Sequence, residues 1–186
     1  MRTRYFLSAL VLAAVFYACQ KEAKQIPVSS VSSSAASSAK TVKTMDPVII
    51  SAASIGQGSV DIKVTAGKPS GAPSGFYIQW ATVAELAAYT GPVDKDGWPL
   101  DATAFCSASF SGNAPNSRYA LVKGQSVTVS IGNLLIDNGA STTCSSILLC
   151  DTQYKFRAFA YANGSLINSP WSNILDARTL LGTCGI

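Results

Sequence analysis

Histidine is absent from the 186-residue chain. This absence excludes serine–histidine triads, histidine proton shuttles and most zinc sites. Charge is also scarce, since only 13% of residues are charged and the basic residues form no run or stripe. Nucleic-acid binding is therefore not expected. No two cysteines have the CxxC spacing that is common in zinc and redox motifs, so neither a metal site nor another cofactor is predicted.

The composition favours an exported all-β domain. Hydrophobic residues make up 48% of the chain, together with many serines, threonines, alanines and glycines. This balance is more typical of an extracellular β-protein than of a helical cytosolic one. The length corresponds to about one domain once a leader is removed.

The first 18 residues have the pattern of a secretory signal peptide. Arg2 and Arg4 precede an apolar run from Tyr5 to Phe16. The run is too short to span a bilayer comfortably, and a positive start followed by an apolar stretch is typical of an export signal. We therefore predict a signal peptide over residues 1–18.

The end of this leader, Phe16-Tyr17-Ala18-Cys19, resembles the lipobox of bacterial lipoproteins of the Bacteroidetes type. The resemblance implies cleavage before Cys19 and acylation of that residue, with chains such as palmitate. It implies anchoring to the outer membrane, on the periplasmic or the cell-surface side. The alternative is a secreted protein that is cleaved near Ala18 and carries no lipid. The five cysteines favour the lipoprotein, because Cys19 is the odd one if the other four form disulfides.

Residues 19–45 are predicted to form a disordered tether. The stretch from Ser29 to Thr44 is rich in serine and alanine and has too little apolar surface to fold. A random coil from Cys19 to Pro47 spans roughly 30 Å. The folded domain is predicted over residues 46–186.

Alternating apolar and polar residues predict a β-sandwich of about seven short strands. The predicted strands cover residues 48–50, 59–65, 76–80, 126–131, 154–162 and 169–179, with 118–122 pairing beside 76–80. Asn163-Gly164-Ser165 supplies the turn between the last two strands. In the predicted strand 154–162, Lys155 and Arg157 alternate with apolar residues, so we expect both on a solvated face.

An insertion follows the third predicted strand and covers residues 83–116. Thr82 and Glu85 have the spacing of a capping box, and good helix formers follow them. The pattern predicts a two-turn helix that ends at Gly91. Beyond it, the insertion has no regular pattern.

The last two strands carry a resemblance to fibronectin type III domains. The residues 152–158, TQYKFRA, resemble strand F of that family, and Ser169-Pro170-Trp171-Ser172 with Ala177-Arg178-Thr179 resembles strand G. The resemblance implies an immunoglobulin-like sandwich in which Tyr154 is the tyrosine corner. The family's usual tryptophan on strand B is missing.

Four cysteines remain in the exported chain, and arithmetic alone allows three pairings. The fibronectin-like resemblance implies that all four gather at one pole of the sandwich. It places Cys150 beside Cys184, across strands F and G. Cys106 would then pair with Cys144 and hold the insertion to the segment before strand F.

Three aromatic residues of the insertion, Tyr89, Trp98 and Phe105, have two interpretations. They form either a platform for sugar rings or a protein partner, or the small core of the insertion itself. Asp94-Lys95-Asp96-Gly97 resembles part of a calcium loop, but no glutamate closes it, so a solvated turn is predicted.

Catalysis is not predicted, because so small a sandwich is not expected to form a cleft around its carboxylates. The expected function is that of a membrane-anchored binding, adhesion or spacer module. Its partners would be the membrane, through the N-terminal lipid, and an unknown protein or glycan bound at the insertion. The alternatives are an accessory or structural subunit of a surface assembly, and a carbohydrate-binding accessory protein that uses Trp98.

Overall fold

The computed structural model describes residues 43–134, 139–144 and 147–182, all within one compact unit, Lys40–Ile186. The signal peptide, Cys19 and most of the predicted tether lie outside the described residues. Thr44 and Met45 fall in the predicted tether, yet they are part of the fold: Thr44 bridges Ile167, and Met45 is buried in the core. The folded part therefore includes residues just before position 46.

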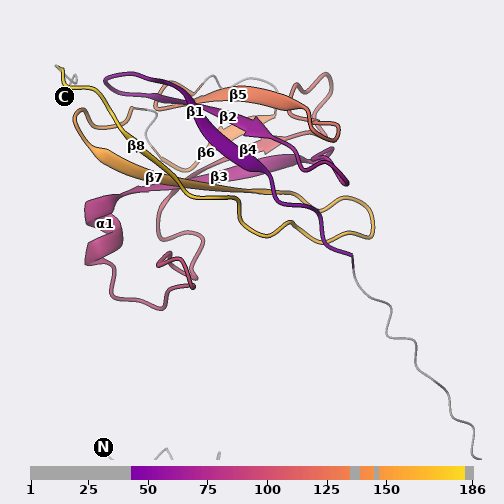
Figure 1. The fold of residues 1–186 in the computed structure, drawn as a ribbon, viewed down its shortest axis with the longest axis horizontal. Coiled ribbons are helices and arrows are strands. Elements are labelled where there is room, and N and C mark those ends of the chain that lie inside the picture. Colours follow the sequence, from indigo (N-terminus) through magenta and orange to yellow (C-terminus); the bar gives the residue numbers. More distant parts are fainter. Residues whose placement is uncertain (1–42, 135–138, 145–146, 183–186) are drawn as a thin grey trace, which may run out of the picture. The chain divides into compact units, whose positions relative to one another are not determined.

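Two antiparallel sheets form a β-sandwich, as the alternation predicts (Figure 1). The three-stranded sheet has the order β1-β2-β5 and the five-stranded sheet the order β6-β4-β3-β7-β8. The strands are β1 (Ile49–Ile55), β2 (Val60–Thr65), β3 (Gly75–Thr82), β4 (Cys106–Ser111), β5 (Ser126–Ile131), β6 (Ala140–Thr142), β7 (Gln153–Ala160) and β8 (Leu175–Arg178).

The core lies between the sheets and is built from alternate residues of each strand. In β2, Val60, Ile62 and Val64 are fully buried, which is the pattern expected of a strand with one face on a core. The opposite sheet contributes large inward side chains, among them Phe76, Ile78, Trp80, Phe110, Tyr154 and Phe156. The period-2 pattern of the sequence thus predicts which face of each of these strands is buried.

The strand beside β3 is not the one predicted. β4 (Cys106–Ser111) pairs with β3, whereas the predicted partner, residues 118–122, makes only an isolated bridge between Leu121 and Ala72. The outward residues of β4 are serines and lack the β-branched side chains typical of strands. The part that departs from the sandwich is therefore the segment from residue 83 to residue 105, here called the 83–105 segment.

The last strand is shorter than predicted. β7 ends at Ala160 and β8 begins at Leu175, so a long connection replaces the expected short turn. Part of it still follows β7, because the amides of Ser169 and Ser172 donate to the carbonyls of Ala160 and Ala158. This pairing places Trp171 beside β7.

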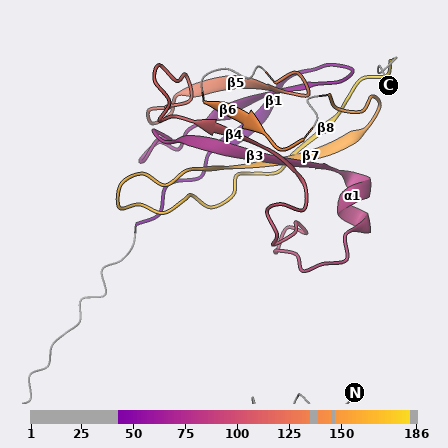
Figure 2. The ribbon, with the colours of Figure 1, turned by 180° about the vertical axis from the view of Figure 1, so that it is seen from behind.

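The predicted helix is present and short. α1 (Val83–Ala88) begins at the N-cap Thr82, whose side chain and that of Glu85 form the predicted capping box. The helix ends at Ala88 rather than at Gly91, and none of its six residues is buried. Figures 1 and 2 show α1 and the rest of the 83–105 segment on the outer side of the five-stranded sheet, away from β1, β2 and β5.

Candidate functional site

The outer face of the five-stranded sheet carries two neighbouring rows of side chains. The strand register aligns Ser107, Gln79 and Arg157 in one row. The next row contains Ser109, Tyr77 and Phe159. Since side chains alternate between the faces of a strand, both rows point away from the core. The 83–105 segment covers the first row, as its contacts with Gln79 and Arg157 show.

Arg157 is buried, with only 3% of its surface exposed, so the prediction of a solvated side chain is wrong for this residue. Its Nε donates to Gln79 Oε1 at 2.9 Å, and its guanidinium pairs with Asp94 of the 83–105 segment. The same group lies 4.5 Å from the ring centre of Trp98 and 3.8 Å from that of Trp171. Lys155 remains half-exposed and pairs with Asp176. The alternation alone does not distinguish the two cations.

The Asp94–Arg157 pair compensates for the burial of charge. Burial lowers the pKa of Arg157, and the carboxylate of Asp94 opposes that shift. Burial alone would raise the pKa of Asp94, but hydrogen bonds from the Trp98 amide, Arg157 and the Asp96 amide outweigh it and hold the pKa below the usual value. The predicted solvated turn is present at Lys95 and Asp96, whereas the carboxylate of Asp94 pairs with buried Arg157.

Tyr89, Trp98 and Phe105 lie together, as both interpretations of the sequence required. Phe105 contacts Tyr89 and Trp98 through edge-to-face ring pairs, with centres 5.8 and 6.3 Å apart. Trp98 is fully buried, while Tyr89 and Phe105 are half-buried. Within the described residues, the indole nitrogen of Trp98 has no hydrogen-bond partner. Trp98 therefore belongs to the core of the 83–105 segment and presents no ring face to a ligand.

A second aromatic group lies on the same sheet face beyond the 83–105 segment. We call Tyr77, Phe159, Tyr161 and Trp171 the aromatic strip; all four are half-buried. Tyr77 and Phe159 stack with ring centres 5.1 Å apart, and Phe159 meets Trp171 at 4.9 Å and Tyr161 at 5.5 Å, both edge to face. The sequence analysis did not single out this group. Its signal was present, because Phe159 and Tyr161 stand at outward positions where polar residues are usual.

Hydrogen bonds hold the strip in place. The hydroxyls of Tyr161 and Ser109 lie 2.6 Å apart, and the Tyr161 amide donates to the carbonyl of Gly75. Gly75 has φ +93°, and a Cβ there would lie 1.9 Å from the Phe110 carbonyl oxygen, so only glycine fits. Burial raises the pKa of Tyr161, so its hydroxyl stays protonated at neutral pH.

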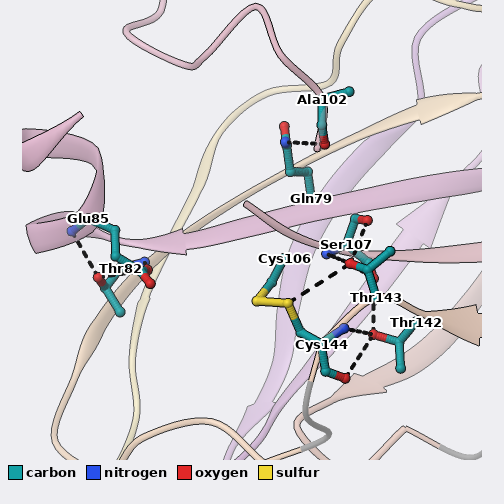
Figure 3. The surroundings of a disulfide bond; sticks show 9 residues. All are labelled: Gln79, Thr82, Glu85, Ala102, Cys106, Ser107, Thr142, Thr143 and Cys144. Atoms are coloured by element: carbon teal, nitrogen blue, oxygen red, sulfur yellow. Dashed lines mark hydrogen bonds between the residues drawn. A yellow bond between two sulfur atoms is a disulfide. The ribbon is translucent and has the colours of Figure 1, made fainter. Parts of the chain in front are cut away.

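The Cys106–Cys144 disulfide, the pairing that the resemblance implied, joins β4 to the residue pair after β6 (Figure 3). Around it, Thr142 Oγ1 donates to the Ser107 carbonyl at 3.0 Å, and Thr143 Oγ1 accepts from the Ser107 amide at 3.1 Å. Cys150 is also disulfide-bonded, while Cys184 lies outside the described residues. The Cys106–Cys144 disulfide therefore fixes the chain directly after the 83–105 segment to the residues that follow β6.

A small pocket lies beside this disulfide. Its volume is about 260 Å³, and its lining is mainly apolar. The lining residues are Trp80, Glu85, Cys106, Cys144, Ile147, Leu148, Leu149 and Tyr154. Within this lining, the hydroxyl of Tyr154 accepts a hydrogen bond of 2.9 Å from the Leu149 amide.

Neither a metal centre nor a membrane-spanning helix is found in the part of the chain that the structure describes. No group of three or more metal-ligating side chains occurs there. No described helix is long and apolar enough to cross a bilayer. No protein-family model matches this chain, and no curated protein matches it.

Proposed function

We propose that the protein is an exported, lipid-anchored binding module that does not catalyse a reaction. In this proposal a fibronectin type III-like sandwich presents the aromatic strip to a ligand. The observation that carries it is the strip itself: four contacting aromatic side chains on the outer face of the five-stranded sheet, of which Tyr77 and Phe159 belong to strands while Tyr161 and Trp171 follow β7. The leader and Cys19 support the anchor.

The strip is not needed to complete the hydrophobic core. The core between the sheets uses the inward residues of β3 and β7, such as Phe76 and Phe156. Outward positions of a two-layer sandwich normally carry polar residues, and a group of partly exposed aromatic rings there is typical of interaction sites. Tyrosine and tryptophan suit such sites because each combines a large apolar body with a polar tip.

Contacts within the domain hold the strip in place before any ligand arrives. Trp171 rests on the buried guanidinium of Arg157, and backbone hydrogen bonds on both sides of it tie its segment to β7. A surface that is already ordered loses little conformational entropy on binding. The 83–105 segment therefore acts as a support, through Arg157, rather than as the contact surface.

The test compares matched tyrosine substitutions on the two aromatic groups. The mature chain, reconstituted in liposomes, is co-sedimented with envelope fragments and with secreted polymer from the source cells. We expect saturable binding by the wild type and a loss of about tenfold or more in Tyr77→Ser/Phe159→Ser. Tyr89→Ser, in the 83–105 segment, should bind as the wild type does. Equal binding by the wild type and the strip variant would contradict the proposal.

A second candidate function is that of a subunit in a surface assembly, and the sheet edges favour it. In the described residues, β5 and β6 each end a sheet and pair with one strand only. At the end of the three-stranded sheet opposite β5, the side chain of Asn173 covers part of the β1 edge. Its amide oxygen accepts a hydrogen bond from the Ile50 amide, and its amide nitrogen donates one to the Ile50 carbonyl. An open edge can pair with a strand of another chain.

Light scattering on the mature chain distinguishes this candidate. An assembly subunit should form oligomers that Thr128→Lys, a charge at an exposed position of β5, disrupts. A wild-type protein that stays monomeric at all concentrations would exclude self-assembly through this edge.

A further inference from the structure

The aromatic strip combines ring surface with hydroxyl groups. Tyr77 and Tyr161 supply two phenol hydroxyls, and Ser109 supplies a third beside Tyr161, at 2.6 Å. Each hydroxyl can donate one hydrogen bond and accept others. A sugar ring has the matching character, because its C–H faces are apolar and its edge carries hydroxyls. The strip thus offers both kinds of contact within one small area.

On the three strands around the strip, which the structure describes in full, both charged side chains are paired. At the outward positions of β3, β4 and β7, the charged residues are Lys155 and Arg157. Lys155 pairs with Asp176, and Arg157 pairs with Asp94. A polyanion such as a nucleic acid or a uronic-acid polymer depends on cations for binding, and these three described strands offer it no unpaired one. The strip therefore suits an uncharged ligand.

Two exposed aliphatic side chains that would suit a protein partner line the pocket beside the disulfide and not the strip. Ile147 and Leu149 are 60% and 63% exposed, and both line the pocket beside the disulfide. The strip contains no aliphatic residue, and its four side chains are few against the roughly 20–30 residues that each partner usually contributes to a stable protein interface. A chain of sugar rings needs less surface than a protein does.

We propose that the ligand of the aromatic strip is a neutral carbohydrate. This inference rests on the proposed function and names the class of ligand for the same site. The rings of Tyr77, Phe159 and Trp171 pack against the C–H faces of the sugar. The hydroxyls of Tyr161 and Ser109 exchange hydrogen bonds with the sugar hydroxyls. Arg157 acts as a positioning residue that holds Trp171 from below.

Affinity electrophoresis of the mature protein tests this inference. The gels contain a neutral β-glucan, α-mannan or xylan, or anionic polygalacturonate as a charged probe. We expect at least one neutral polymer to retard the wild type, and the retardation to persist at about 0.5 M salt, where exposed charges are screened. Tyr77→Ser/Phe159→Ser should lose about tenfold or more in affinity. Tyr161→Phe should lose less, because it removes one hydroxyl contact and leaves the three packing rings in place.

The controls separate a lost site from a lost fold. Tyr89→Ser should keep full retardation, and thermal unfolding should show that the strip variant is folded. Retardation that survives in the folded strip variant would overturn both the carbohydrate inference and the proposed site. A wild type that ignores all neutral polymers, yet binds envelope fragments through the strip, would overturn only the carbohydrate inference and point to a protein ligand. Retardation by polygalacturonate alone would also overturn it.

Discussion

Arg157 is the residue on which the 83–105 segment depends. It is a buried cation whose partners come from three places: Gln79 on β3, Asp94 in the segment, and Trp171 after β7. A buried charge is costly unless it is paired and hydrogen-bonded. The segment supplies the pairing carboxylate, so its folding and the burial of Arg157 are coupled.

Replacing Asp94 by asparagine should therefore destabilise the protein. The change leaves the Arg157 charge buried without its partner, and breaking a buried pair costs about 3–5 kcal/mol. Asp94 is partly exposed, so we expect the lower end of that range. Urea unfolding at neutral pH measures the loss. A variant as stable as the wild type would contradict the role of the pair.

The same pair predicts a direction for the pH dependence. The pKa of Asp94 is lowered in the folded protein relative to its ordinary value of 3.8. A depressed pKa contributes stability that is present above the unfolded value and is lost as pH falls through the folded value. The stability difference between wild type and Asp94→Asn should thus be full at neutral pH and shrink below pH 3.8. A gap that widens in acid would contradict this.

Trp98→Ala distinguishes a core residue from a ligand contact. Because Trp98 is fully buried against Phe105 and Arg157, its truncation should lower the free energy of unfolding by about 3–5 kcal/mol. Thermal or urea unfolding provides the measurement. If the variant is as stable as the wild type but fails to bind neutral polysaccharide, Trp98 is a ligand contact after all.

At the scale of elements, the 83–105 segment is held at both ends and in the middle. The capping box of Thr82 and Glu85 starts it as α1. Gln79 donates to the Ala102 carbonyl near its other end, and the Cys106–Cys144 disulfide follows directly (Figure 3). Since α1 buries none of its residues, these attachments rather than helix packing keep the segment on the sheet.

Removing this disulfide should weaken the domain without changing its fold. The bond joins residues 38 apart, and a loop of that size corresponds to about 2–4 kcal/mol. Cys106→Ser/Cys144→Ser should show that loss in urea unfolding, together with faster amide exchange in the 83–105 segment. Unchanged stability and exchange would show that the bond does not hold the segment.

At the scale of the whole molecule, a single mass measurement tests both the lipid anchor and the number of disulfides. Export and lipidation are inferred from residues 1–19, and export permits disulfides. The protein isolated from its native membrane should begin at Cys19 and carry acyl chains. Its intact mass should rise by about four daltons on reduction, for two disulfides. A mass without lipid would make the protein a released one and would contradict the anchored module.

Local spacing in the sequence was enough to predict much of the fold. The alternation in β2, β5 and β7 indicated their buried faces, and the Thr82–Glu85 spacing indicated a capped helix. These features depend on residues a few positions apart, so the sequence displays them directly. β4 was missed because its three serines, single alanine and single phenylalanine give weak β-propensity, and its pairing with β3 is a long-range contact.

The exposure of the aromatic strip and the burial of Arg157 were decided only by the tertiary structure. Lys155 and Arg157 have the same local pattern, yet one is half-exposed and the other is buried. The difference arises because the 83–105 segment folds back over Arg157 and supplies Asp94, 63 positions away. It stops short of Tyr77 and Phe159, so these rings remain half-exposed. A distant segment determines which outward side chains are covered, through the place where it packs on the sheet. The periodicity of a single strand does not contain that information.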